Sequence, residues 1–124
     1  IMRADPKMTY NKLLRKNLIS CSSTMVKREV MQQYSFDGDK MHEDYSCWLR
    51  ILKKTPYAVG VDEPLLIYRI VQNSKSHGRL NSAKMIFNSY RYVGFNYVSA
   101  FLLTIRYSFH SISKHRKINR SNQA

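Results

Sequence analysis

Acidic residues are missing from the second half of this sequence. All eight Asp and Glu residues lie at or before Glu63, whereas the segment from Pro64 to Ala124 has ten Lys or Arg and no acid. The whole chain has 21 Lys and Arg against 8 Asp and Glu, which gives a formal charge of +13. Such an excess predicts a polyanionic partner, which would be nucleic acid, anionic lipid or a phosphorylated substrate.

Cysteine is scarce and long apolar runs are absent. The two cysteines, Cys21 and Cys47, show no CxxC or Cys/His metal spacing, which favours free thiols in a reducing cytoplasm. No N-terminal signal peptide is visible. The uncharged run over residues 93–105 is shorter than the ~20 apolar residues of a membrane-spanning helix. Because the sequence begins with Ile1, we expect a piece of a longer reading frame, or a start at Met2.

The chain is long enough for one domain around one core, with 124 residues of which 44% are hydrophobic and 12% aromatic. Residues 2–7 are expected to form an irregular lead-in, and Asp-Gly marks a loop at 35–40. Another loop is expected at 72–78. The pattern predicts helices over 10–16 (capped by Thr9), 27–34, 42–54 and 80–93, and short strands at 24–26, 57–61 and 64–71.

The segment MHEDYSCWLRIL, residues 41–52, is the central feature. Glu43 and Asp44 open its helix, and Trp48, the only tryptophan, follows one turn after Asp44. Acids at a helix start are favoured by the exposed backbone N–H groups, without any chemistry. Alternatively, a carboxylate beside an indole can hold and deprotonate a sugar hydroxyl. The apolar face of this helix would carry Tyr45, Leu49 and Leu52.

The last third of the sequence is the most periodic. Its apolar residues recur at steps of three and four and would form one stripe along a helix. A basic cluster, KHRKINR, follows at 114–120. This combination predicts binding to an anionic membrane surface, or else a helix docked on the protein's own core or on a second copy. The stripe consists of Phe95, Val98, Leu102, Ile105, Phe109 and Ile112.

The order of these parts resembles the C-terminal, acceptor-side half of family 2 glycosyltransferases, the inverting GT-A enzymes that build bacterial surface polysaccharides. The matching parts are TYNKLLRKNLISCSSTMVKREV, HEDYSCWLRIL, a two-strand run ending in YRI, and a Ser-rich loop, and together they cover about residues 9–76. The resemblance implies an α/β fold: the helix-rich C-terminal portion of a GT-A domain with a few short strands and an amphipathic C-terminal helix. Residues 1–92 would form the acceptor-side half, and residues 93–124 a basic amphipathic tail.

On the acceptor side, the resemblance implies that Asp44 is the catalytic base. It would remove the proton from the acceptor hydroxyl as that oxygen attacks the anomeric carbon. Glu43 would orient the acceptor or the helix start. Trp48 would line the acceptor site, and its alternative role is that of a core tryptophan.

On the donor side, Cys21, Ser22 and Ser23 match a short turn that faces the donor sugar in the family, where small residues let the backbone approach the ligand. They fit a plain turn equally well. Arg69, in the YR pair, and Lys75 would approach the donor diphosphate, because guanidinium and ammonium groups both suit phosphate. The alternative for Arg69 is a surface position on an edge strand.

The sequence departs from the family in lacking the nucleotide-binding half and a usable Asp-x-Asp metal motif. We expect the complete enzyme to need a divalent metal, Mg or Mn, whose site is absent from this chain. Asp37-Gly38-Asp39 has the right letters but is interpreted as a loop. His77 is a candidate metal or phosphate contact, or a solvated loop histidine. It lies beyond Val71, which stands where the family often has histidine.

The function implied is a fragment of an inverting glycosyltransferase of polysaccharide synthesis. It would use a nucleotide-sugar donor and a saccharide or lipid-linked acceptor, and it would be inactive without the missing half. We expect it in the cytoplasm or on the inner face of the bacterial plasma membrane.

Two alternatives from other classes remain. The nine tyrosines among many Lys and Arg would suit a basic nucleic-acid-binding module, although no known signature supports a specific nucleic acid. A non-catalytic assembly module would form a homo-oligomer through the stripe of the 95–112 helix.

Overall fold

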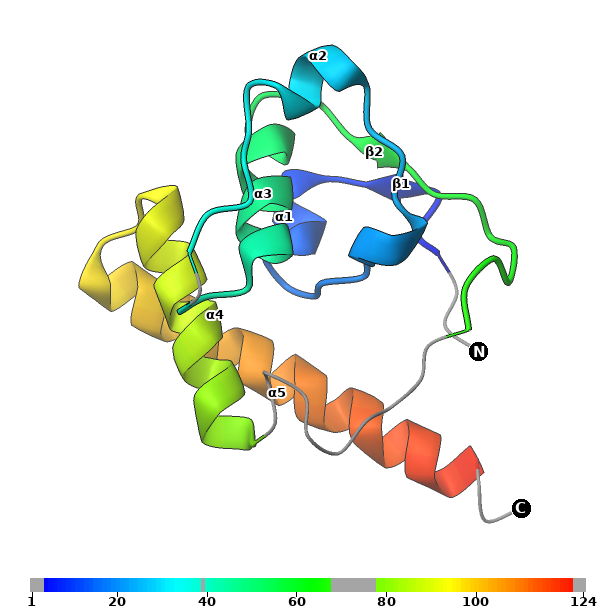
Figure 1. Ribbon diagram of the computed structural model, residues 1–124. Coiled ribbons are helices and arrows are strands. Elements are labelled where there is room, and N and C mark those ends of the chain that lie inside the picture. Colours follow the sequence, from blue (N-terminus) through cyan, green and yellow to red (C-terminus); the bar gives the residue numbers. More distant parts are fainter. Residues whose placement is uncertain (1–3, 39, 68–77, 122–124) are drawn as a thin grey trace.

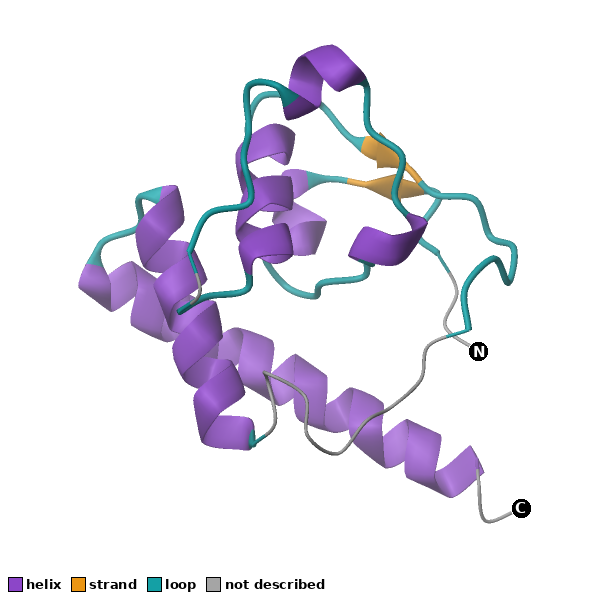
Figure 2. Ribbon diagram, viewed as in Figure 1, coloured by secondary structure: helices purple, strands orange, loops and turns teal. Residues whose placement is uncertain are grey.

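The computed structural model describes residues 4–38, 40–67 and 78–121, and for residues 79 and 111–121 it describes the backbone alone. Helices dominate, and one short two-stranded ribbon lies on the other side of α3 from α4 (Figure 1, Figure 2). In chain order the elements are β1 (Lys7–Met8), α1 (Tyr10–Leu13), the 3₁₀ turn η1 (Cys21–Ser23), α2 (Arg28–Met31), α3 (Glu43–Leu52), β2 (Ala58–Val59), α4 (Arg79–Val93) and α5 (Tyr97–Ser121).

The first helix begins as its sequence predicts and ends early. The Thr9 hydroxyl accepts a hydrogen bond from the backbone N–H of Lys12 at 3.4 Å, so the predicted cap is confirmed. Leu13 is fully buried. The α-helix itself is only four residues long, whereas the sequence predicts it to extend to residue 16.

The two strands form an antiparallel pair in which Lys7 faces Val59 and Met8 faces Ala58. The later strand was expected within residues 57–61. The earlier one was not, because two residues are too few to show an alternating pattern. The structure therefore places a strand at the end of the segment that the sequence predicted to be an irregular lead-in.

Two other strand predictions are wrong within the described part of the chain. Residues 24–26 form no strand, and the Met25 side chain is completely exposed. Residues 64–67 form none either, and Ile67 is 97% exposed. Both segments have the composition of strands, but a strand also needs a neighbour to pair with and a core to cover. No pairing strand is present for either segment among the described residues, although Val26 does pack against the core.

The core is built around α3, which packs against α1 and α4. The hydroxyl oxygens of Tyr45 and Tyr90 lie 3.0 Å apart inside this core. Tyr45 donates to the backbone carbonyl of Leu13 at 3.1 Å, and Tyr90 donates to that of Leu14 at 2.9 Å. The carbonyls left free at the end of α1 are therefore bound by side chains from two other helices.

A glycine corner joins α4 to α5. Gly94 has φ +107° and ends α4 in the left-handed region. The Asn96 side chain then accepts a hydrogen bond from the N–H of Ser99 at 2.8 Å and caps α5. This corner lies shortly after residue 92, where the sequence predicts the first domain to end. Across it, α5 still packs on α4, and the rings of Tyr107 and Tyr45 are 5.7 Å apart.

The predicted apolar stripe of α5 does not face this core. Ala100 is fully buried and Thr104 is 8% exposed, whereas Val98 and Leu102 on the stripe are 70% and 60% exposed. Small side chains let two helices approach closely, so α5 docks through Ala100 and Thr104, with Leu103 and Tyr107 packed beside them, and leaves the stripe residues Val98 and Leu102 outside. Ile112, at the end of the stripe, lies outside the described side chains. No helix in the described ranges combines the length and apolar character that crossing a bilayer requires.

Candidate active site at the start of α3

The start of α3 is fixed by α4. The Asn88 side chain donates to the backbone carbonyl of Lys40 at 2.7 Å, and the backbone N–H of His42 donates to the Ser89 hydroxyl at 3.2 Å. Ser89 is itself fully buried. These two bonds hold the loop directly before the acid pair, so a helix some 45 residues later in the sequence sets the pair's position.

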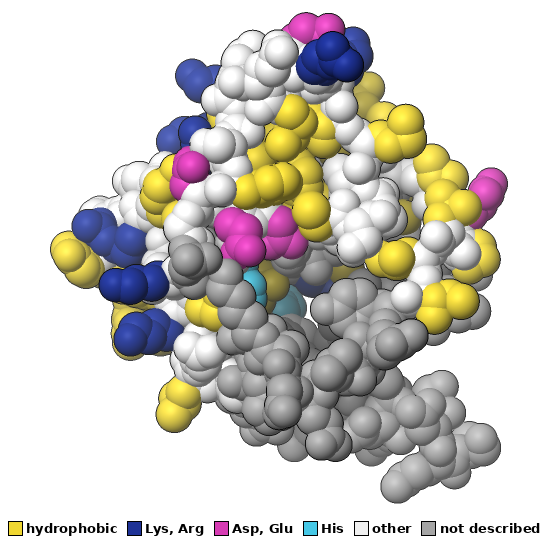
Figure 3. Space-filling model, viewed as in Figure 1, with side chains coloured by type: hydrophobic (Ala, Val, Ile, Leu, Met, Phe, Trp, Pro, Cys, Tyr) yellow, Lys and Arg dark blue, Asp and Glu magenta, His cyan; other side chains and the backbone are white. Residues whose placement is uncertain are grey.

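Glu43 and Asp44 occupy the first turn of α3, and both side chains are half-buried. One carboxylate oxygen of Asp44 accepts a hydrogen bond from the backbone N–H of Tyr45 at 2.7 Å. Figure 3 shows acidic side chains gathered near the middle of this face of the molecule, next to apolar ones. The backbone N–H groups of the first turn attract negative charge, which suits acidic side chains at this position.

The acid pair lies close to two groups from distant parts of the chain. The pKa of the exposed Cys21 thiol is raised by desolvation and further by the negative charges of Asp44 and Glu43. Burial raises the pKa of Tyr107, and the Asp44 carboxylate adds to that shift. The structure therefore brings the predicted donor-side turn and the predicted base into one neighbourhood.

The other two residues of that turn, Ser22 and Ser23, are exposed. The backbone N–H of Ser23 donates to the carbonyl of Ser20 at 3.2 Å, and the N–H of Thr24 donates to that of Cys21 at 3.4 Å. These local bonds hold the turn in its conformation.

Trp48 belongs to the core. It is 5% exposed, and its ring meets that of Phe36 edge-on with centroids 5.7 Å apart. Its indole N–H is the one buried side-chain polar atom in the described part of the chain that has no hydrogen-bond partner. Buried donors are nearly always bonded, so this N–H, one turn after Asp44, is a group that a bound molecule or a water could satisfy.

The sequence is similar to known bacterial proteins. Over 114 residues, which are 91% of this chain and 45% of the relative, the sequence is 29% identical to TuaG, a teichuronic acid biosynthesis glycosyltransferase of Bacillus subtilis (strain 168). Over 83 residues, 65% of this chain and 32% of the relative, it is 35% identical to WfgD of Escherichia coli. The latter is named UDP-Glc:alpha-D-GlcNAc-diphosphoundecaprenol beta-1,3-glucosyltransferase.

The chain is a distant homologue of bacterial surface-polysaccharide glycosyltransferases. It spans less than half the length of the two relatives it matches. No protein-family model and no solved structure matches it.

Several residues expected to serve this glycosyltransferase homologue lie outside the described residues. They are Arg69, Lys75 and His77, together with Asp39 of the Asp-Gly-Asp loop. Among the residues that are described, no group of three or more His, Cys, Asp or Glu could hold a metal ion.

The loop interpretation of Asp37 is confirmed. Its carboxylate accepts hydrogen bonds from the Tyr92 hydroxyl at 2.6 Å and from the Ser35 hydroxyl at 2.8 Å, and Arg50 lies 3.5 Å away. These bonds lower the pKa of Asp37. In the glycosyltransferase homologue this carboxylate ties the loop to α3 and α4, which is a structural role.

A shallow hollow between the loop before α3 and the side of α4 was not predicted from the sequence. It is open to solvent and has a volume of about 470 Å³. Two of its residues, Asn88 and Tyr92, come from α4, so no local motif around the acids could have revealed it. Its lining residues are Gly38, Lys40, Met41, Asn88 and Tyr92.

Proposed function

We propose that this chain is the acceptor-side part of an inverting, family 2 GT-A glycosyltransferase in which Asp44 is the catalytic base. The supporting observation is the half-buried carboxylate of Asp44, held in the first turn of α3. The chain carrying it is a distant homologue of surface-polysaccharide glycosyltransferases. The match to the Bacillus relative covers 91% of the chain and so includes α3.

The proposed step needs one positioned base. The free oxygen of the Asp44 carboxylate takes the proton of an acceptor hydroxyl, while the other oxygen stays bound to the N–H of Tyr45. The acceptor oxygen forms a bond to the anomeric carbon, and the bond from that carbon to the nucleoside diphosphate breaks on the opposite face, which inverts the configuration. General base catalysis typically contributes about 10²–10⁴-fold to the rate.

The substrate classes follow from the relatives. The Escherichia coli relative is named for a UDP-Glc donor and a diphosphoundecaprenol-linked acceptor, and we propose a nucleotide sugar and a saccharide or lipid-linked acceptor for this chain. Glu43 and Trp48 would contact the acceptor, and the turn of Cys21 would face the donor sugar. Arg69 and Lys75 would meet the donor diphosphate, to which both charges are suited.

A chimaera tests the base without depending on where this sequence begins or ends. The segment of the Escherichia coli relative that matches this chain is replaced by this chain's own residues, and glucose transfer from UDP-Glc to the lipid-linked acceptor is measured. We expect Asp44→Asn to lower turnover about 10²–10⁴-fold and to leave UDP-Glc binding unchanged.

The matched control is Asp37→Asn, which removes a carboxylate of structural role and is expected to retain turnover. Near-normal turnover of Asp44→Asn would show that Asp44 is not the base. On its own, the 124-residue chain is expected to transfer no sugar, and detectable transfer from a nucleotide sugar would contradict its assignment as a partial catalytic unit.

A further inference from the structure

One side of α5 exposes a continuous apolar surface, here called the outer face. Successive members stand three or four residues apart or next to one another, so they fall within one sector of the helix. The outer face consists of Val98 (70% exposed), Phe101 (59%), Leu102 (60%), Ile105 (39%) and Phe109 (69%).

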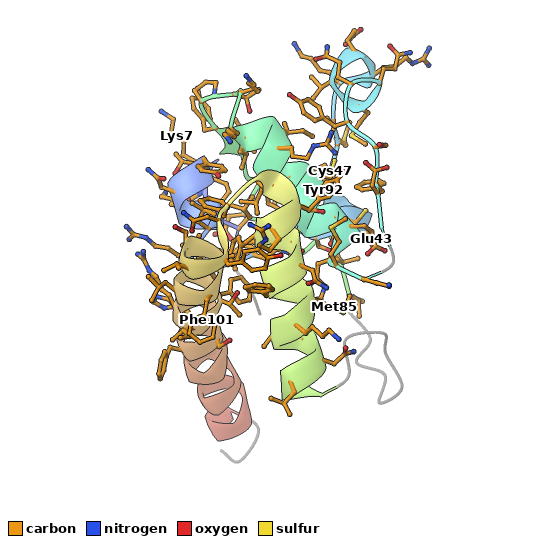
Figure 4. The ribbon with its side chains drawn as sticks, turned by 90° about the vertical axis from the view of Figure 1, so that its left-hand side faces the viewer. Lys7, Glu43, Cys47, Met85, Tyr92 and Phe101 are labelled. Atoms are coloured by element: carbon orange, nitrogen blue, oxygen red, sulfur yellow. The ribbon has the colours of Figure 1, made fainter. Side chains whose placement is uncertain are left out.

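This face is on the opposite side of α5 from its contact with the core. At 100° per residue, Ala100, Thr104 and Tyr107 point about 120–180° away from the centre of the outer face, and Ala100 and Thr104 are buried. Figure 4 shows Phe101 directed away from α4. The core therefore leaves the outer face uncovered, and large contiguous apolar patches of this kind usually mark an interaction surface.

The charge around the outer face indicates the chemistry of its partner. The sequence from Pro64 onward has no acid, Arg106 on α5 is exposed, and the basic segment 114–120 continues the same helix. A second copy would bring another chain of formal charge +13 to this surface. A nucleic acid would satisfy the charge but would leave the aliphatic side chains uncovered. An anionic lipid surface offers both acidic headgroups and acyl chains.

We propose that the outer face of α5 binds an anionic lipid bilayer, with the helix lying in the plane of the headgroups. The apolar side chains enter the boundary between headgroups and acyl chains, and the basic residues stay among the phosphates. In Figure 4, Glu43 and Phe101 lie on opposite sides of α4, so lipid bound to the outer face leaves the acid pair open. This docking is separate from the transfer chemistry and is measured without any sugar.

Vesicle flotation tests the proposal on the purified protein. We expect binding to vesicles of phosphatidylcholine with phosphatidylglycerol, little binding to phosphatidylcholine alone, and weaker binding at high salt. The double variant Leu102→Gln/Phe109→Gln should lower the partition coefficient about tenfold or more. Arg106→Glu should lower it several-fold. Met25→Gln, which changes a fully exposed apolar residue far from α5 in the sequence, is the matched control and should bind normally.

A labelled variant keeps the test valid if the double variant fails to fold. With Cys21 changed to Ser, Leu102→Cys and Met25→Cys are each labelled with a polarity-sensitive dye. Anionic vesicles should shift the emission of the label at 102 to that of an apolar environment, and should leave the label at 25 unchanged.

Three results would overturn the proposal. The first is equal binding by the double variant and the parent, and the second is binding that does not depend on phosphatidylglycerol. The third is self-association abolished by the double variant, with no vesicle binding by the parent, which would assign the outer face to a second copy.

Discussion

At the scale of single residues, the start of α3 combines two side chains with different constraints. Asp44 is half-buried and has one oxygen engaged by the Tyr45 N–H, whereas Trp48 is almost wholly buried and has an N–H without a partner. The carboxylate is thus positioned without being enclosed. The Trp48 indole, by contrast, is buried, and its N–H has no hydrogen-bond partner. The contribution of its packing to stability can therefore be measured separately from any contribution of the N–H to ligand binding.

We predict that Trp48→Phe lowers the free energy of unfolding by about 1–2 kcal/mol, as expected for lost packing alone. The indole N–H makes no hydrogen bond, so no buried acceptor is left without a donor in the variant. Urea unfolding followed by far-UV circular dichroism measures the change. A loss well above 3 kcal/mol would show that the N–H is bonded in the folded protein.

A second prediction concerns pH. Burial raises the pKa of Tyr90 to about 12, and burial followed by the neighbouring Tyr90 also raises that of Tyr45. Both folded-state values lie above the unfolded value of about 10, so the folded protein retains protons that the unfolded chain releases. Stability should therefore be independent of these groups below pH 10. Between pH 10 and 12 it should fall by about 1.4 kcal/mol per pH unit for each tyrosine.

Urea unfolding at several pH values tests this. Tyr90→Phe should make the decrease in unfolding free energy above pH 10 less steep by about 1.4 kcal/mol per pH unit, which is the effect of one proton. An unchanged slope in Tyr90→Phe would mean that the buried hydroxyl of Tyr90 does not carry the effect.

At the scale of elements, α5 shows how far periodicity alone can be interpreted. The stripe through Val98 and Leu102 correctly predicted a helix. The apolar side of a surface helix usually faces the core, whereas here these two side chains are exposed. What decides the orientation is the close approach of Ala100 and Thr104 to α4, together with the contact of Tyr107 with Tyr45. That information lies in other helices and not in the sequence of α5.

In the candidate active site, too, local features could be predicted from the sequence, whereas contacts between distant segments could not. Acids at a helix start are a local signal, so Glu43 and Asp44 could be placed from the sequence. The proximity of Cys21 to them could not, because it depends on how α1 and η1 fold back over α3. The strand predicted at 64–71 is absent over residues 64–67 because strand propensity does not supply a pairing partner.

The corner between α4 and α5 depends on the left-handed backbone of one glycine, and substitution there tests how the two helices are joined. Gly94 adopts φ +107°, and no heavy atom lies within 4 Å of the point that an alanine Cβ would occupy, so Gly94→Ala meets backbone strain and no steric clash. We expect a loss of about 1–2 kcal/mol in the free energy of unfolding. Thermal and urea denaturation measure it. Asn96→Ala, which removes the cap of α5, should cost about 1 kcal/mol at the same corner. No change in Gly94→Ala would show that the corner relaxes to another geometry.

At the scale of the whole molecule, one core joins parts of the chain that are far apart in sequence. Met8 and Leu13 near the start, Trp48 in the middle and Ala100 in α5 belong to a single cluster of buried residues. Although α5 follows a break between helices, it shares side-chain contacts with α3 and α4. The protein should therefore lose its tertiary structure and most of its helix together.

We predict coincident urea transitions for the fluorescence of Trp48, which reports the α3 core, and for the far-UV circular dichroism, to which the 25 residues of α5 contribute most. A helical signal that persists after the Trp48 transition would show that α5 is an independent unit. Tyr107→Ser, which removes the ring packed on Tyr45, should shift both transitions to lower urea.

The hydrogen bond from Tyr90 to the carbonyl of Leu14 spans 76 positions of sequence. During synthesis on the ribosome, Leu14 leaves the exit tunnel long before Tyr90 has been translated. Closing so long a loop must precede any gain from the contact, so α1 of a nascent chain has to wait for a partner not yet made. Until Tyr90 has been synthesised, α1 cannot adopt the arrangement that this bond secures.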